Sequence, residues 1–429
     1  MKKNILFILL INYQLFSNNI EVLKPIDISK TKSTRNGLDV LIEDYPNILK
    51  NKKIGLVTNH TGITKDSKNN YKIFQDHPNI LLKKIFAPEH GFFGEASAGA
   101  KVNYENNNFE KVEIISLYGK NKKPTSDMLK GLDLIIYDIQ DIGARFYTYI
   151  STLGMVIESA AEHNIEIMVL DRPNPIGGEI IEGAILDTSF KSFVGYYPIP
   201  IRYGMTVGEL TNMAVSENWL SPLPKKITIV AMDSWKRSML FDDTSLPWVP
   251  PSPNIPDLET AIIYPGMCLI EATNISEGRG THKPFKQIGA PWITKTLIEE
   301  LQKMALDGIK IKFTSFSPKS ITGKASKPKF ENEICFGSSF KITDEYKYKS
   351  LEIGLITISV IGNLYNNQFE FNNNNLNRLY GNQNLTNFLN SAIQSERINL
   401  KYSISKFLKN QENDLQRFIT KSSKYYLYD

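Results

Sequence analysis

Residues 132–170 read LDLIIYDIQDIGARFYTYISTLGMVIESAAEHNIEIMVL, and their pattern indicates the fold class. The apolar, β-branched runs at 132–137 and 165–170 are typical of buried strands. Between them, residues 149–163 place apolar side chains at intervals of three and four, the spacing of a helix that lies on a sheet. A strand, a helix and a second strand in this order predict a parallel βαβ unit.

The same alternation of expected strands and helices continues on both sides of this unit. Further short apolar runs occur at 54–57, 81–86, 112–117 and 227–232. A helix is also expected shortly after Tyr203. Because strands alternate with helices, we expect an α/β domain with a doubly wound, mostly parallel sheet at residues 35–265.

The pattern changes beyond a Pro-dense segment at 247–256, which cannot continue a helix or a central strand. This segment is interpreted as a rigid connector or the wall of a groove. Helices are expected at 294–306 and 351–365, and strands at 309–316 and 339–343. Their mixed order indicates a second, smaller α+β domain at residues 266–429.

Length and composition exclude several classes of protein. The chain has 429 residues, 41% of them hydrophobic and 22% charged, as in ordinary globular proteins. Its net charge of +5 is spread thinly, so no nucleic-acid partner is expected. Only two cysteines occur, which excludes a disulfide framework but leaves one bridge open. The sequence leaves the oligomeric state open.

The first 20 residues resemble a secretory signal. Lys2 and Lys3 precede an apolar run at 5–11, and Ser17 offers a small residue for cleavage. The run is shorter than the roughly 20 residues that span a bilayer, so stable membrane insertion is not expected. We therefore expect a periplasmic or secreted protein. The alternative is a cytosolic protein with a slightly apolar N-terminus.

Polar side chains directly follow four of the expected strands. Ligands of doubly wound sheets bind beyond the carboxyl ends of the strands, which makes these residues candidates for a site. They are Asn59 and His60, Glu89 and His90, Asp138, Asp141 and Arg145, and finally Asp171, Arg172 and Asn174. Helix capping and local ion pairs are the alternative roles. No Gly-x-Gly-x-x-Gly motif follows the first strand, so we expect no dinucleotide, and no other cofactor is indicated.

A fifth cluster lies at 271–292. Glycines flank Arg279, so the backbone there can approach a ligand while the guanidinium grips a carboxylate. Glu277 and Thr281 stand beside it, and Trp292 offers an apolar face to a sugar ring. A turn with an exposed arginine is the alternative.

Several of these motifs together resemble the bacterial exo-β-N-acetylmuramidase family, once described as a domain of unknown function. They are NHTG at 59–62, PEHGF at 88–92, YDIQDIGARFYTY at 137–149, DRPNP at 171–175 and EGRGT at 277–281. The resemblance implies a Rossmann-like domain, a smaller C-terminal domain and a cleft between them. It also implies release of N-acetylmuramic acid (MurNAc) from the non-reducing end of peptidoglycan fragments, with Glu89 as the catalytic carboxylate. Phe93 departs from the family, in which Arg often follows Gly-Phe.

Glycoside cleavage usually needs two carboxyl groups. Within the resemblance, Glu89 is the expected general acid beside His90, and Asp138, Asp141 or Glu277 is the second carboxylate. The lactyl carboxylate of MurNAc calls for a cation, for which Arg279 and Arg145 are candidates. Tyr147, Tyr149 and Trp292 could stack on the sugar, or simply belong to the core.

Two further functions stay open at this point. One is a non-catalytic protein that binds muropeptides or sugars in the same pocket. The other is a metal-dependent hydrolase that uses His90, Asp138 and Asp171. The spacing of these residues matches no known metal signature, so we expect no metal.

Overall fold

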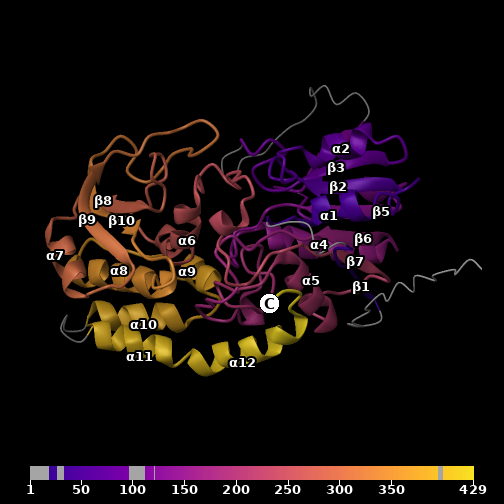
Figure 1. Ribbon diagram of the computed structural model, residues 1–429. Helices are drawn as coiled ribbons and strands as arrows, with labels where there is room; N and C mark the ends of the chain where they lie inside the picture. The colour runs from indigo at the N-terminus through magenta and orange to yellow at the C-terminus, as the bar shows by residue number, and fades with distance from the viewer. Residues whose placement is uncertain (1–18, 27–32, 96–111, 120, 395–399) are drawn as a thin grey trace, which may run out of the picture.

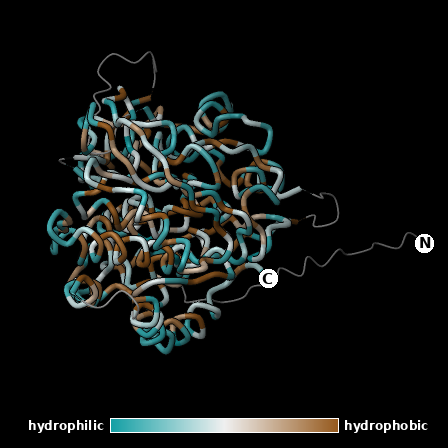
Figure 2. Tube along the Cα trace, turned by 90° about the vertical axis from the view of Figure 1, so that its left-hand side faces the viewer, coloured by the Kyte–Doolittle hydropathy of each residue, from teal (hydrophilic) through white to brown (hydrophobic). Residues whose placement is uncertain are grey.

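The computed structural model describes residues 19–26, 33–95, 112–119, 121–394 and 400–429 (Figure 1). The expected signal sequence therefore lies almost wholly outside the described residues. No described helix is both long and apolar enough to cross a bilayer. The apolar parts of the chain gather in the interior, and polar loops cover the outside (Figure 2).

A parallel sheet of seven strands forms the first half of the molecule, in the order β1-β7-β6-β5-β2-β3-β4. The strands are β1 (Ile20–Leu23), β2 (Lys53–Thr58), β3 (Leu81–Ala87), β4 (Glu113–Ser116), β5 (Leu134–Asp138), β6 (Glu166–Leu170) and β7 (Ile227–Val230). Without β1, this is the order of a Rossmann fold, and the strand order reverses between β2 and β5. The predicted doubly wound parallel sheet is confirmed.

Helices cover both faces of this sheet. They are α1 (Gly37–Asp44), α2 (Asn70–Asp76), α3 (Ser126–Leu129), α4 (Tyr149–Glu162) and α5 (Val207–Ser216). In β5, Leu134 and Ile136 point into the core beneath α1 and α2, whereas Ile135 and Tyr137 point to the side of α4 and α5. This alternation buries both faces, which explains why the strands read as continuous apolar runs.

The second half contains an antiparallel sheet in the order β8-β10-β9, with strands Gln287–Ala290, Cys335–Ile342 and Ile309–Phe316. It packs on α7 (Thr296–Lys303), which in turn contacts α8 (Ser350–Leu364). Helix α8 is buried along most of its length and crosses α6 (Leu258–Met267) closely. A Cβ atom at Gly354 would lie 2.6 Å from the carbonyl oxygen of Gly266, so this crossing needs glycine. Both cysteines are free and buried.

The C-terminal helices carry the chain back to the first half. Helices α9 (Asn373–Tyr380), α10 (Asn384–Ile393), α11 (Leu400–Lys409) and α12 (Glu412–Ser422) run along one side of the molecule (Figure 1). The last residues then reach the carboxyl end of the large sheet, where the hydroxyl of Tyr428 donates at 2.6 Å to Asp171, the residue directly after β6. The N-terminal strand β1 also joins this sheet, beside β7. Neither end of the chain was expected there from the sequence.

Candidate active site

Side chains from both halves of the chain line one pocket of about 120 Å³. Its walls come from the turn after β3, the start of α4, the Pro-dense segment and the 271–285 region. The lining residues are Glu89, His90, Phe146, Tyr147, Thr148, Val194, Ser252, Asn254, Ile255, Tyr264, Glu271, Arg279 and Phe285. Of the predicted site residues, the structure brings Glu89, His90, Tyr147 and Arg279 together here.

A tight turn after β3 presents Glu89 to this pocket. The N–H of Gly91 donates to the carbonyl of Pro88 at 3.1 Å, and His90 has a φ of 69°. That left-handed conformation is unfavourable for a residue with a Cβ atom, and such strain is concentrated at functional sites. The hydroxyl of Thr148, at the start of α4, donates to Oε2 of Glu89 at 2.6 Å. The carboxyl group is therefore held from two different elements.

The Pro-dense segment is a wall of the pocket because residues at the end of β2 hold it in place. Nε2 of His60 donates to the carbonyl of Pro250 at 2.8 Å. The Tyr149 hydroxyl donates to the carbonyl of Pro251 at 2.7 Å and accepts from Nδ2 of Asn59 at 3.0 Å. Asn59 and His60 thus support the pocket without lining it.

Arg279 lies between two glutamates at the other side of the site. Its Nη2 and Nε donate to Oε1 of Glu271 at 2.6 and 3.2 Å, and Nε lies 3.5 Å from Oε1 of Glu277. The guanidinium also lies over the ring of Phe285, 5.0 Å from its centroid. Burial alone would lower the pKa of Arg279, but the two carboxylates outweigh it and raise that pKa above its ordinary value.

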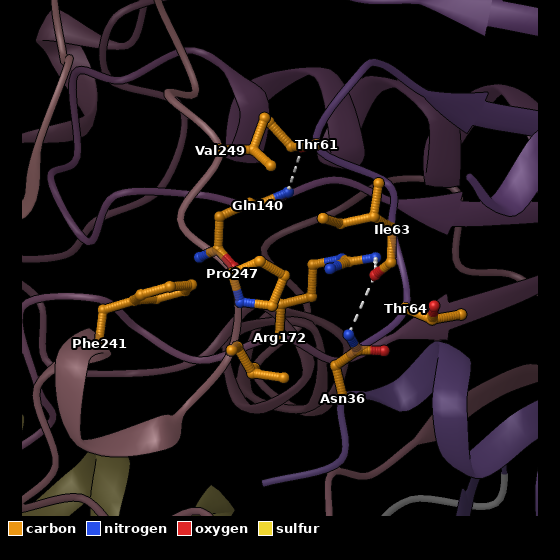
Figure 3. Close-up of a pocket in the computed structure, with 10 residues that line it drawn as sticks. Asn36, Thr61, Ile63, Thr64, Gln140, Arg172, Phe241, Pro247 and Val249 are labelled. Carbon is orange, nitrogen blue, oxygen red and sulfur yellow. Dashed lines mark hydrogen bonds between the residues drawn. The ribbon is translucent and has the colours of Figure 1, made fainter. Parts of the chain in front are cut away.

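Asp138 and Arg172 do not reach this pocket, because they form a buried ion pair with each other. Nε of Arg172 lies 2.6 Å from Oδ1 of Asp138, and Nδ2 of Asn70 donates to the other carboxylate oxygen at 2.7 Å. The pair fills the crevice where the strand order reverses. The cavity left beside Arg172 measures about 10 Å³, room for one water molecule at most (Figure 3).

Four other predicted residues also have structural partners away from the pocket. Asp141 accepts from the N–H of Gly143 at 2.8 Å, and burial raises its pKa to about 6. Arg145 is fully buried and donates to backbone carbonyls, among them that of Leu379 at 2.8 Å. Nδ2 of Asn174 donates to the carbonyl of Met205 at 3.0 Å.

Asp171 is the fourth of these residues. It is completely buried and accepts from the hydroxyls of Thr206 and Tyr428 at 2.7 and 2.6 Å. Burial raises its pKa to about 7, although these hydrogen bonds lower the pKa in part. Its role is to anchor the C-terminal tail.

Three candidates of the fifth cluster lie behind or beside the pocket. Oε2 of Glu277 lies 3.1 Å from Nζ of Lys329, and Thr281 donates to the carbonyl of Gly278 at 2.6 Å. Trp292 packs against Tyr365, with ring centroids 5.4 Å apart. Glu277 and Thr281 order the loop that carries Arg279, and Trp292 belongs to the packing of the second half.

Comparison with known proteins identifies the family. The sequence model described as exo-β-N-acetylmuramidase NamZ, N-terminal, matches residues 54–259, and its C-terminal counterpart matches residues 262–428. The chain belongs to the NamZ family. It is 42% identical, over 93% of its length and 92% of the relative's, to the peptidoglycan β-N-acetylmuramidase NamZ of Bacillus subtilis.

Two solved structures share the NamZ-family fold. Both are DUF1343 family proteins of Bacteroides fragilis, and each comparison covers 93% of this chain. One is 32% identical with a TM-score of 0.82 over all of that chain, and the other is 30% identical with a TM-score of 0.70 over 99% of it.

Sequence reasoning overlooked several residues of this NamZ-family pocket. Thr148 lies in the motif at 137–149 and Glu271 begins the cluster at 271–292, but a hydroxyl and a further carboxyl group gave no separate signal. Ser252 and Asn254 lie in the Pro-dense segment, whose interpretation as a groove wall fits their position. Among the described residues, no three His, Cys, Asp or Glu side chains gather as metal ligands.

Proposed function

We propose that the chain is an exo-acting glycoside hydrolase that releases MurNAc from the non-reducing end of peptidoglycan-derived saccharides during cell-wall turnover and recycling. One observation carries the proposal: a carboxyl group, Glu89, and a guanidinium, Arg279, line the same small pocket. Membership of the NamZ family supports it. The pocket measures about 120 Å³, small beside the roughly 300–1,000 Å³ of sites for drug-sized ligands, which favours a short ligand over a long saccharide.

In this proposal, Glu89 is the general acid. It passes its proton to the glycosidic oxygen as the bond between that oxygen and the anomeric carbon breaks. Water supplies the oxygen that then bonds to the anomeric carbon; one of its protons stays on the new hydroxyl group, and the other returns to the protein. Glu271 is the other carboxyl group that lines the pocket, and we propose it as the second carboxylate.

The test is release of free MurNAc from the disaccharide MurNAc-β-1,4-GlcNAc by the purified protein, with a chelator present and Glu89→Gln alongside. Release by the wild type alone supports the hydrolase and the role of Glu89. Saturable binding of the disaccharide without turnover would instead favour a sugar-binding protein. Activity that the chelator abolishes would favour a metal-dependent hydrolase.

We also propose that residues 1–20 direct export to the periplasm or the medium. The two lysines and the apolar run near the N-terminus support this assignment. Ile20 pairs with Ile227 in the large sheet, so cleavage upstream of Ile20 would leave β1 whole. Fractionation of cells and N-terminal sequencing of the mature chain test both statements.

A further inference from the structure

Arg279 is the one lysine or arginine among the described residues that line the pocket. A ligand carboxylate that enters this pocket loses water and needs a cationic partner there. The edge of the guanidinium formed by Nε and Nη2 is already occupied, because Glu271 accepts a hydrogen bond from each of these atoms and Glu277 lies 3.5 Å from Nε. A carboxylated ligand can therefore bind this edge of Arg279 only if a glutamate gives way.

The two glutamates differ in their freedom to move. The Glu277 side chain is 7% exposed and does not line the pocket, and its Oε2 forms an ion pair with Nζ of Lys329 at 3.1 Å. The Glu271 side chain lines the pocket, is 31% exposed, and contacts Arg279 through Oε1 alone. Glu271 is thus the partner that can leave, while Glu277 keeps the guanidinium in place.

We propose that Glu271 occupies Arg279 in the free protein and that the lactyl carboxylate of MurNAc takes its place on binding. The inference rests on the proposed function, because this carboxylate is what distinguishes MurNAc from N-acetylglucosamine (GlcNAc). The planar guanidinium presents paired N–H donors to any carboxylate, so the buried Arg279 keeps a carboxylate partner when one ion pair replaces the other. A neutral sugar offers no such replacement and leaves the Glu271 pair intact.

This exchange makes Glu271 a determinant of specificity. MurNAc must displace an internal competitor, so its observed affinity is lower than Arg279 alone would give. Removal of the Glu271 charge should therefore strengthen binding of MurNAc and leave GlcNAc unaffected. The displaced carboxyl group remains in the pocket beside the bound sugar, free of its arginine.

Equilibrium binding of free MurNAc and free GlcNAc, measured by calorimetry, tests the exchange. Glu271→Gln should bind MurNAc about fivefold more tightly than the wild type, which corresponds to about 1 kcal/mol for a partly exposed ion pair. GlcNAc binding should not change. Glu277→Gln is the matched control: it removes the same charge behind Arg279, and MurNAc affinity should stay within about twofold. Arg279→Gln should lose the preference for MurNAc.

A second measurement uses the wild type and so does not depend on the folding of any variant. The methyl ester of the MurNAc lactyl group carries no charge and should bind no better than GlcNAc. Equal or weaker MurNAc binding by folded Glu271→Gln, or ester binding equal to that of MurNAc, would overturn the exchange. Either result can occur in a protein that releases MurNAc from the disaccharide, whereas absence of release defeats the proposed function itself.

Discussion

The hydroxyl of Thr148 donates a 2.6 Å hydrogen bond to Oε2 of Glu89 and thereby joins the start of α4 to the turn after β3. Both residues line the pocket, and Thr148 is 8% exposed. The turn itself is strained at His90. The hydrogen bond therefore fixes the orientation of a carboxyl group whose backbone is already held in one conformation.

Replacement of the carboxyl group tests its place in the chemistry. Glu89→Gln keeps the shape of the side chain and removes the transferable proton, so kcat should fall by about 10²- to 10⁴-fold. Rates of MurNAc release from the disaccharide measure the effect. The thermal unfolding midpoint should stay close to that of the wild type. Full activity in the folded variant would remove Glu89 from the mechanism.

The hydroxyl of Thr148 positions Glu89, and its removal should act through that residue. Thr148→Val is similar in shape but cannot donate, so we expect kcat to fall about tenfold with a smaller change in KM.

Thr148→Ser is the control for this prediction, because it restores the donor without the methyl group. It should recover most of the activity. A valine variant with an unchanged kcat would show that the hydrogen bond has no part in catalysis.

Asp138 should behave as a structural residue. Its partner Arg172 is 4% exposed, so Asp138→Asn leaves a buried guanidinium without its counter-charge and should reduce the free energy of unfolding by about 3–5 kcal/mol. Denaturant titration measures this loss, and kcat of the folded fraction should change little. A stable variant without activity would instead place Asp138 in the chemistry.

The fold could be predicted wherever local pattern and burial agree. Strands β2 to β7 are short apolar runs, and each was expected from the sequence within a few residues. Strand β1 was not, because Ile20–Leu23 gains its place only by pairing with β7, more than 200 residues away along the chain. The C-terminal tail reaches the large sheet through a hydrogen bond from Tyr428 to Asp171, and no local sequence pattern indicates this contact.

The sequence predicted the edge of the sheet at which the candidate site lies, but not which residues form the site. Asp138 and Glu89 both follow apolar strands, and sequence alone cannot tell which of them meets an arginine in the interior. Arg172 forms a buried ion pair with Asp138, and the two side chains fill the crevice where the strand order reverses. The open pocket lies instead beside the turn after β3, where the second half of the chain supplies Glu271 and Arg279.

The buried carboxyl group of Asp171 should make stability depend on pH. Burial raises its pKa to about 7, whereas the unfolded chain has a pKa of roughly 3.9 at this residue. As pH rises from about 4 to about 7, the unfolded state loses this proton first, so the free energy of unfolding falls across that window. Asp141, whose pKa burial raises to about 6, contributes with the same sign.

Asp171→Asn cannot ionise and should flatten this dependence while the hydroxyls of Thr206 and Tyr428 turn to act as acceptors for its amide. Across this window, the free energy of unfolding of the wild type should fall by a few kcal/mol more than that of the variant. The upper bound of this difference is about 4 kcal/mol, at roughly 1.4 kcal/mol per pKa unit. Denaturant titrations at four pH values between 4.5 and 7.5 measure it. Identical slopes would mean that Asp171 is ionised in the folded protein throughout this window. The backbone N–H groups of Arg172 and Gly208 and the hydroxyls of Thr206 and Tyr428 would then offset the cost of burying its charge.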